Sequence, residues 1–568
     1  MTSSAVFVIL LFTLESFHAT PNVCVENLGC LQGTFMPGFQ SDKFEAFMGV
    51  PFAQPPVGEL RFSNPKPIKP WEGILDATKA RPDCIQKNYL LPQPFVSGDE
   101  DCLYLNIYRP TKNDNKPVPV MVYIFGGGFF SGTASPLIHG PEYFMDTKEV
   151  ILVTLAYRLG ALGFLSTGDI NMPGNFGLKD QNLALKWVQN YISYFGGDAG
   201  NVTIFGQSAG AVSVHMHILS DLSSGLFKRA IVMSGNAGAP YATPISNPLA
   251  QARKQAELVG IPDANSMSSE ELTKALREID ATKIIESGDG FKYWHVDPLT
   301  TFRPVIEEPS PDAFLTVDPS ELIASGRYTQ VPWMTGMVPN EGAVRALSII
   351  SNETLRSDFN NNFDDFIGKL MEFPFTEGVD SKINDLINHY FYGIHELNEK
   401  TTQNFVDMIT DRAFVQPFYK NIKQYVETAD LKNNPVFLYR FNYRGPFSYS
   451  TLYTGNFNNY GVVHCDDLIY LFRSPLLFSV DFDKNSVEAK VLKEMVDTFV
   501  SFAKTGRPKG TSDSSLAECN SQVMSKTDDN KICSYKEIKN SINGFSVKID
   551  NYFDIAKVKL WDRILNNN

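Results

Sequence analysis

The pentapeptide GQSAG at positions 206–210 sets Ser208 between two glycines, directly after the apolar run 202–205 and directly before the stretch AVSVHMHIL. A strand, the pattern G-x-S-x-G and a helix together form a nucleophile elbow, in which the glycines permit a tight turn and keep side chains away from the serine. The pentapeptide alone is weak support, because short patterns recur by chance. Its flanking segments favour a nucleophilic Ser208 over one more serine in a tight turn.

A serine hydroxyl needs a histidine to take its proton, and after such an elbow the chain order is serine, acid, histidine. His464 lies in GVVHCDD, a loop past the apolar run 436–443, from which it would reach the elbow from above. His215 and His217 lie on the helix that leaves the elbow and, two residues apart, face different ways. We therefore predict that His464 is the base and that the other two are structural rather than a metal pair.

The acid is expected at the end of an intermediate strand. Glu341 lies in the turn PNEG after the apolar run 331–338, where a carboxylate would orient the imidazole and stabilise its charged form. The alternative, a solvated turn carboxylate, remains open from the residues alone.

A tetrahedral intermediate needs donors for its oxyanion. Gly126, Gly127 and Gly128 follow the apolar run 119–125, and their N–H groups, joined by that of Ala209, suit this purpose. A phosphate loop is the alternative, but no GxGxxG or GxxxxGK[ST] pattern is present. The chemistry indicated is acyl transfer, which needs no cofactor and no metal.

Short apolar runs indicate the strands that must hold these residues. Five of them are nearly continuous rather than alternating, which is typical of strands covered on both faces in a largely parallel sheet. They are 119–125, 150–157, 202–205, 230–233 and 436–443. Between them lie helical patterns such as 178–194, so the sequence predicts an α/β fold.

The chain has 568 residues without an internal repeat, a low-complexity tract or a long Pro/Gly linker, so we predict one catalytic domain over 21–568. The apolar run 5–14 is too short to span a bilayer, and we interpret 1–20 as a cleaved secretory signal peptide, with a buried first strand as the alternative. No second stretch reaches transmembrane length. We therefore expect an exported protein without stable membrane insertion.

Charge and cysteine usage agree with export. The net charge is −13 with scattered Lys and Arg, so nucleic acid is not expected as a partner. None of the seven cysteines shows CxxC spacing; pairing of neighbours would join Cys24 to Cys30, Cys84 to Cys102 and Cys519 to Cys533 and leave Cys465 free, although sequence does not fix connectivity. Asn201 and Asn352 begin glycosylation sequons, which matter only in an exported chain.

Taken together, these residues resemble the type-B carboxylesterases of the cholinesterase-like α/β-hydrolase family, from about residue 24 to 508. The matching pieces are FMGVPFAQPPVGELRF, GDEDCLYLNIY, FGGGFFSG, NFGLKDQNLALKWVQNYISYFGGD, GQSAGA, VMSGNAG, NEGA and GVVHCDDLIYLF. The resemblance implies an α/β-hydrolase fold with a large, mostly parallel central sheet flanked by helices. It also implies Ser208, Glu341 and His464 as the triad; Gly127, Gly128 and Ala209 as the oxyanion hole; a disulfide between Cys84 and Cys102; and Ser234 as a buried serine beside the triad.

Two departures from the family pattern are visible. Phe125 stands where many relatives carry a histidine before the glycines; because the donors are backbone groups, this change should retune the pocket and leave catalysis intact. The usual second disulfide after the elbow has no cysteines between Cys102 and Cys465.

Within the family the chain is similar to insect secreted esterases, including juvenile hormone esterases, but the shared pieces do not fix the substrate. We predict a secreted serine carboxylesterase that hydrolyses small apolar esters. Juvenile hormone esterases, detoxification esterases and odorant esterases are enzymes of this kind. A neutral-lipid lipase differs only in lid and pocket. A non-catalytic adhesion protein of the same fold would have no reason to keep triad and glycine donors together. Oligomeric state stays open.

One further expectation concerns choline esters. In cholinesterases a tryptophan in the loop between the first disulfide cysteines holds the quaternary ammonium by cation–π attraction. Here that loop, 85–101, contains no Trp and only Tyr89 and Phe95 as aromatic residues. The residue before the nucleophile, glutamate in cholinesterases, is the neutral Gln207. We therefore expect a preference for uncharged esters, with Tyr89 as the one residue able to replace the missing tryptophan.

Overall fold

The structure is a computed structural model that describes residues 20–111, 116–373, 378–478, 481–511, 518–519, 533–551 and 553–566. The predicted signal peptide, 1–20, lies outside the described residues except for Thr20, so it stays a prediction. The single domain predicted for 21–568 also stays a prediction. Of the helices described, none has both the length and the apolar character needed to cross a membrane.

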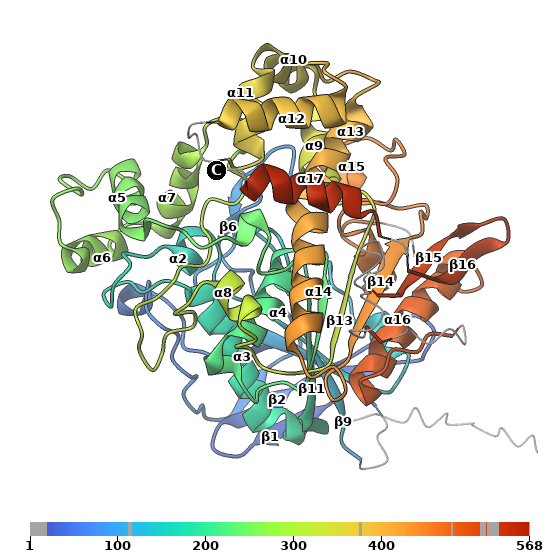
Figure 1. The fold of residues 1–568 in the computed structure, drawn as a ribbon. Helices are drawn as coiled ribbons and strands as arrows, with labels where there is room; N and C mark the ends of the chain where they lie inside the picture. The colour runs from blue at the N-terminus through green and yellow to red at the C-terminus, as the bar shows by residue number, and fades with distance from the viewer. Residues whose placement is uncertain are drawn as a thin grey trace, which may run out of the picture.

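The described chain folds around a large twisted sheet (Figure 1). Its eleven strands, in sheet order, are β16 (Gly544–Asp550), β15 (Tyr535–Ser541), β14 (Val436–Asn442), β13 (Trp333–Met337), β12 (Arg229–Met233), β11 (Gly197–Gln207), β9 (Val118–Ile124), β10 (Ile151–Leu155), β8 (Tyr104–Pro110), β4 (Phe44–Pro51) and β3 (Thr34–Met36). Neighbours from β15 to β10 pair in parallel, whereas β16, β8, β4 and β3 pair antiparallel at the two edges. The sheet is therefore mostly parallel at its centre, as the sequence predicts.

Two small sheets lie apart from the large one. The first joins β1 (Asn22–Val25), β2 (Gly29–Gln32) and β5 (Ile74–Asp76), and the second joins β6 (Gln86–Lys87) to β7 (Val96–Ser97). Both lie in the first hundred residues, which also contain three of the four cysteines of two predicted disulfides.

Helices flank the sheet. They are α1 (Glu142–Met145), α2 (Gly160–Phe164), α3 (Phe176–Tyr191), α4 (Ala209–Leu219), α5 (Pro248–Leu258), α6 (Ser269–Arg277), α7 (Ala281–Glu286), α8 (Pro319–Ala324), α9 (Ala343–Ser351), α10 (Glu353–Asn361), α11 (Phe363–Leu370), α12 (Val379–Phe391), α13 (Thr402–Thr410), α14 (Gln416–Thr428), α15 (Ser450–Thr454), α16 (Val487–Thr505) and α17 (Ile555–Asn566). Every residue of β10 and β12 is buried, which is what a parallel strand covered on both faces requires.

The predicted runs coincide with β9, β10, β11, β12 and β14. The helix predicted over 178–194 is α3, which begins two residues earlier, at Phe176, and gives way to a short 3₁₀ turn at Ile192–Phe195. Gly196 then ends the turn at φ +83°, a left-handed conformation that glycine adopts without steric cost.

Three disulfides join the neighbouring cysteines. Cys24 and Cys30 face each other across β1 and β2, Cys84 is bonded to Cys102, and Cys519 is bonded to Cys533. Cys465 is the free cysteine, and its side chain is partly exposed.

Peptide mapping under non-reducing conditions is expected to recover these three linkages and to find Cys465 alkylated as a free thiol. The linkages restrict the unfolded chain and so stabilise the fold, although each closed loop is short and each contribution is correspondingly small. Recovery of any peptide pair linked through Cys465 would contradict this pattern.

Candidate active site

Ser208 occupies the sharp turn between β11 and α4. Its backbone has φ +59° and ψ −126°, a strained conformation for a residue with a side chain. The Ser208 N–H donates to the Met233 carbonyl at 2.9 Å, and the Ser208 carbonyl accepts from Val212 N–H at 2.9 Å, so neighbouring elements hold the turn in place. The predicted elbow is present at the predicted residue.

The two flanking glycines are required by close packing against the end of β9. A Cβ on Gly206 would lie 2.6 Å from the Ile124 carbonyl oxygen, and one on Gly210 would lie 2.1 Å from the same atom. No side chain fits at these distances. The motif therefore reflects the approach of the elbow to the neighbouring strand as well as the turn itself.

Glu341 and His464 form a buried pair. The His464 Nδ1 and Glu341 Oε2 atoms are 2.5 Å apart, with the residues 2% and 0% exposed. The other carboxylate oxygen of Glu341 accepts from Val338 N–H at 2.9 Å, which fixes its orientation just past β13. The loops that carry the two residues are joined directly, since Asn340 N–H donates to the Val462 carbonyl at 3.1 Å.

The surroundings of the pair shift the pKa of the His464 imidazole. Burial lowers the pKa of His464, but the neighbouring Cys465 sulfur and the Glu341 carboxylate raise it, and the net pKa lies well above 6.5. With Glu341 ionised, Nδ1 carries the proton that bridges the pair. At pH values above the raised pKa of His464, the second ring nitrogen, Nε2, is free to accept.

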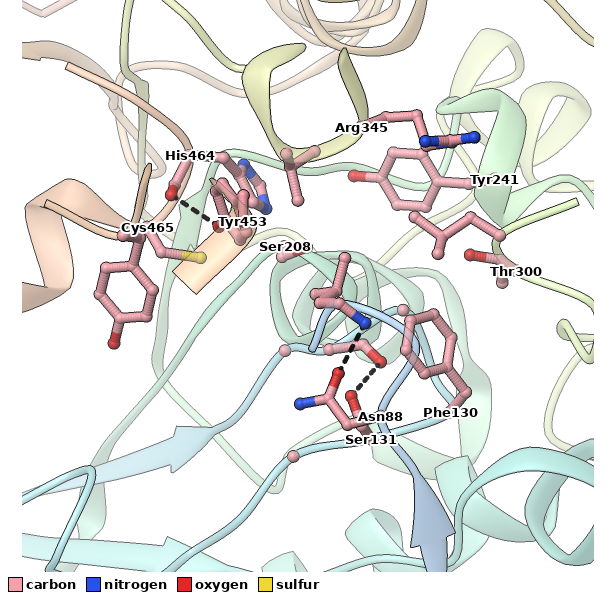
Figure 2. A pocket seen from close by; sticks show the side chains of 18 of the residues that line it. Asn88, Phe130, Ser131, Ser208, Tyr241, Thr300, Arg345, Tyr453, His464 and Cys465 are labelled. Carbon is pink, nitrogen blue, oxygen red and sulfur yellow. Dashed lines mark hydrogen bonds between the residues drawn. The ribbon is translucent and has the colours of Figure 1, made fainter. Parts of the chain in front are cut away.

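In this structure Nε2 faces the Gln207 amide nitrogen at 3.2 Å, and the Gln207 amide oxygen accepts from the Cys465 thiol at 3.3 Å. Ser208 and His464 line the same cavity (Figure 2), but no hydrogen bond joins the Ser208 hydroxyl to a described residue. Catalytic hydrogen bonds are often long or misaligned before substrate binds. The structure thus pairs the predicted acid and base directly and sets the predicted nucleophile beside them.

The loop that carries His464 is pinned by a residue that sequence reasoning did not assign a structural role. The Asp466 carboxylate accepts from the N–H groups of Val463 and Tyr449, at 2.9 and 2.8 Å, and from the Ser448 hydroxyl at 2.9 Å. Burial raises its pKa to about 7. The Tyr453 hydroxyl donates to the His464 carbonyl at 3.0 Å (Figure 2), so both sides of the histidine are held.

The predicted oxyanion donors surround the elbow. Gly127 and Gly128 follow β9 with φ +109° and +59°, conformations that favour glycine, and both line the cavity with Ser208. The Gly127 carbonyl accepts from the N–H groups of Phe130 and Ser131, which closes the glycine turn and leaves the glycine N–H groups without a partner among the described residues. Ala209 opens α4, where an N–H has no acceptor inside the helix.

Ser234 lies at the end of β12, 2% exposed, with its N–H bonded to the Gly336 carbonyl at 2.8 Å. Its hydroxyl has no hydrogen-bond partner among the described residues, so its role beside the triad stays a prediction. Phe125, the departure from the family pattern, is buried and stacks on Tyr157 with 4.5 Å between ring centroids.

The remaining predicted features have ordinary structural surroundings. His215 and His217 are fully buried on α4; His217 contacts Ser223 and Gln181, and His215 accepts from the Ala237 N–H. Their structural interpretation agrees with this packing. Asn352 is exposed and caps α10, whereas Asn201 is half-buried on β11.

Above Ser208 lies a cavity of about 460 Å³. Figure 2 shows Ser208 between two sides of this cavity, with Tyr453, His464 and Cys465 on one and Tyr241, Thr300 and Arg345 on the other. Its apolar lining includes Leu90, Leu91, Phe130, Ile138, Leu299, Val344, Met371, Ile409, Phe414, Leu468 and Leu477. Such a volume and lining suit a small, largely apolar molecule.

A mostly parallel sheet flanked by helices, with a serine on a strand–turn–helix elbow, defines an α/β-hydrolase fold. A model of the carboxylesterase family matches residues 19–545. The chain therefore belongs to the carboxylesterase family and is a carboxylic ester hydrolase.

Curated relatives agree with this assignment. The chain is 40% identical to a juvenile hormone esterase of Tribolium castaneum over 94% of this chain and 91% of that protein. It is 35% identical to venom carboxylesterase-6 of Apis mellifera over 84% and 85% of the two chains. An acetylcholinesterase of Bungarus fasciatus is 34% identical over 86% and 79%.

Among solved structures, the chain is similar to the juvenile hormone esterase of Manduca sexta with OTFP covalently attached. The TM-score is 0.80 at 28% identity, covering 96% of this chain and all of that one.

Proposed function

We propose that the protein is a secreted serine carboxylesterase in which Ser208, His464 and Glu341 form the triad and hydrolysis passes through an acyl-enzyme. The buried contact of 2.5 Å between His464 and Glu341, beside the strained Ser208 elbow, carries this proposal. An imidazole paired at Nδ1 and unprotonated at Nε2 is what a serine hydroxyl needs to lose its proton.

The proposed reaction begins when an ester carbonyl lies against Ser208. His464 Nε2 leaves the Gln207 amide and accepts the serine proton as Oγ attacks the carbonyl carbon. The N–H groups of Gly127, Gly128 and Ala209 bind the oxyanion, and Glu341 stabilises the imidazolium. His464 then protonates the departing alcohol. A water, activated by the same nitrogen, releases the acid and restores Ser208.

For the substrate, we propose small apolar esters. The cavity is lined mainly by aliphatic and aromatic side chains and has the volume of a small-molecule site. Two of the similar proteins are juvenile hormone esterases, which makes a juvenile hormone the first natural ester to test.

The test is a kinetic screen in which acyl and alcohol lengths are varied separately. An apolar cavity predicts that kcat/KM rises with apolar chain length until the cavity is filled and then falls. Preference for long-chain triacylglycerols over all small esters would instead indicate the lipase.

Secretion is proposed from the predicted signal peptide, the three disulfides and the presence of a venom carboxylesterase among similar proteins. N-terminal sequencing of the exported protein tests it, with a first residue near position 20 expected. Retention of Met1 in exported protein would contradict a cleaved leader.

Acetylcholine is expected to be no better a substrate than its neutral tert-butyl isostere. Tyr89, the one candidate for a cation-binding face, donates its hydroxyl to Asp289 at 2.9 Å, and the Lys292 ammonium already lies 4.4 Å from its ring centroid. A desolvated cation–π subsite contributes about thirtyfold in kcat/KM, whereas we expect a ratio of about one or less.

The two substrates differ in charge and match in shape, so the ratio isolates the cation. A clear preference for acetylcholine would show that a cation subsite exists elsewhere in the cavity.

A further inference from the structure

Arg412 lies on an unusual segment of the cavity wall. Residues Asp411–Val415 form a π-helical turn between α13 and α14, and such turns are rare and frequently occur at functional sites. Arg412, Ala413 and Phe414 of this turn all line the cavity. The Phe414 ring centroid is 5.2 Å from that of His464, so the same turn that carries Arg412 also packs against the predicted base.

The Arg412 guanidinium is held but not neutralised. Its Nε donates to the Met371 carbonyl at 3.3 Å, and its Cζ atom lies 5.8 Å from the centroid of the buried Trp561 ring. No carboxylate among the described residues lies within ion-pair distance of it, and its two terminal nitrogens have no hydrogen-bond partner there. Glu372, the acidic residue nearby, pairs with Arg303 at 2.8 Å instead.

Arg412 is partly buried in the cavity wall and keeps its charge. Desolvation lowers its pKa to about 10, and Glu372 raises it, so the group stays protonated at neutral pH. An unpaired cation in a largely apolar wall is costly unless something polar reaches it. The terminal nitrogens therefore have donor capacity that the described protein does not use.

The other two cations of the cavity wall differ from Arg412 in this respect. Arg345 binds both carboxylate oxygens of Asp297, with Nε 2.9 Å from each. Lys369 is paired with Asp365 at 2.6 Å. Of the lysines and arginines in the described cavity wall, Arg412 is thus the one whose charge has no carboxylate partner.

We infer that Arg412 is a specificity-determining residue, which donates to an acceptor oxygen that the substrate carries away from its scissile ester. The same charge disfavours a substrate with a cation at that place. This inference rests on the proposed ester hydrolysis in the same cavity. Because the contact is remote from the reacting atoms, it stabilises bound substrate and transition state alike and acts mainly on KM.

The experiment uses the native enzyme and methyl esters of straight-chain acids in which a ketone is placed at successive carbons, with the unsubstituted esters as reference. A second set carries the ketone in the alcohol. A hydrogen bond to a charged donor predicts a KM about ten- to a hundredfold lower for the ketone ester at the position that reaches Arg412, with kcat nearly unchanged. A trimethylammonium group at that position is expected to raise KM.

Variants then test whether Arg412 causes the ketone preference. Arg412→Met keeps the length and apolar contact of the side chain but removes the charge, and it is expected to abolish the ketone preference while plain esters are still hydrolysed. Arg412→Lys should retain part of the preference. Lys369→Met, which removes a cavity-wall cation that is already paired, should leave it unchanged.

The possible outcomes distinguish failure of this inference from failure of the proposed function. Equal KM values for ketone and plain esters at every position in the native enzyme would overturn the inference, and this measurement does not depend on the variants folding. A ketone preference that survives Arg412→Met would also overturn it. Absence of hydrolysis of every ester would instead refute the proposed function.

Discussion

Ser208→Ala is expected to lower ester turnover by about a million-fold while the protein stays folded. The nucleophilic oxygen is lost, and only the oxyanion donors and substrate binding remain to assist water. The Ser208 hydroxyl makes no hydrogen bond to a described residue, so its removal costs little stability. Single-turnover kinetics and a thermal melt on the same preparation measure both effects.

A covalent label distinguishes this role from a merely structural one. An organophosphate should modify the native protein once, at the peptide that contains Ser208, and His464→Ala should suppress the modification because an unassisted hydroxyl reacts slowly. Ser193→Ala serves as the control and should keep both labelling and turnover, because Ser193 is exposed in the 3₁₀ turn before β11, whereas the elbow follows the other end of that strand. Label recovered on another peptide would refute the elbow assignment.

Glu341→Gln is expected to lower kcat by about ten-thousandfold with little change in thermal midpoint. The glutamine can still accept from Val338 N–H, so the loop is kept, but the charge that stabilises the imidazolium is gone. The pH profile adds a second readout. His464 must be unprotonated at Nε2, so kcat/KM falls as pH drops through its raised pKa; without the carboxylate, that limb moves to lower pH.

The chain offers a matched control for this variant. His395 and Asp364 form another histidine–carboxylate pair, with 2.6 Å between Nδ1 and Oδ1, but both side chains are about half exposed. Asp364→Asn should therefore leave kcat and the pH limb unchanged. Near-native activity of Glu341→Gln would show that the acid lies elsewhere, with Asp466 and Asp467 the next carboxylates to test.

The central strands were predictable because their physical signal is local. A strand buried on both faces, such as β10 or β12, needs a continuous apolar run, and such a run can be recognised in a single sequence. The antiparallel edge strands were not predicted. β16 buries none of its residues, so it lacks an apolar run and is defined by its pairing with β15.

The same distinction separates the parts of the site. Ser208, Glu341 and His464 were predicted because each follows an apolar run in the required chain order. The contact between Gln207 and His464 spans 257 residues of chain, and the position of Arg412 depends on a π-helical turn that no local pattern announces. Such features arise only when distant segments pack, so sequence reasoning had no signal for them.

The backbone hydrogen bond between Asn340 and Val462 joins the loop of the acid to the loop of the base. The reacting pair is therefore held independently of the residues that select the substrate. After the acid, which follows β13, the chain forms α9 to α14, returns to the sheet as β14, and then forms α15 before it reaches the base (Figure 1). These helices and their connections supply much of the cavity wall, including Val344, Ile409 and Arg412. Since the loops of the acid and the base are fastened to each other, the helices between β13 and β14 can acquire substitutions or change length while the proton-transfer pair keeps its geometry. A new ester preference is therefore reachable through residues 343–435 without rebuilding the reaction centre.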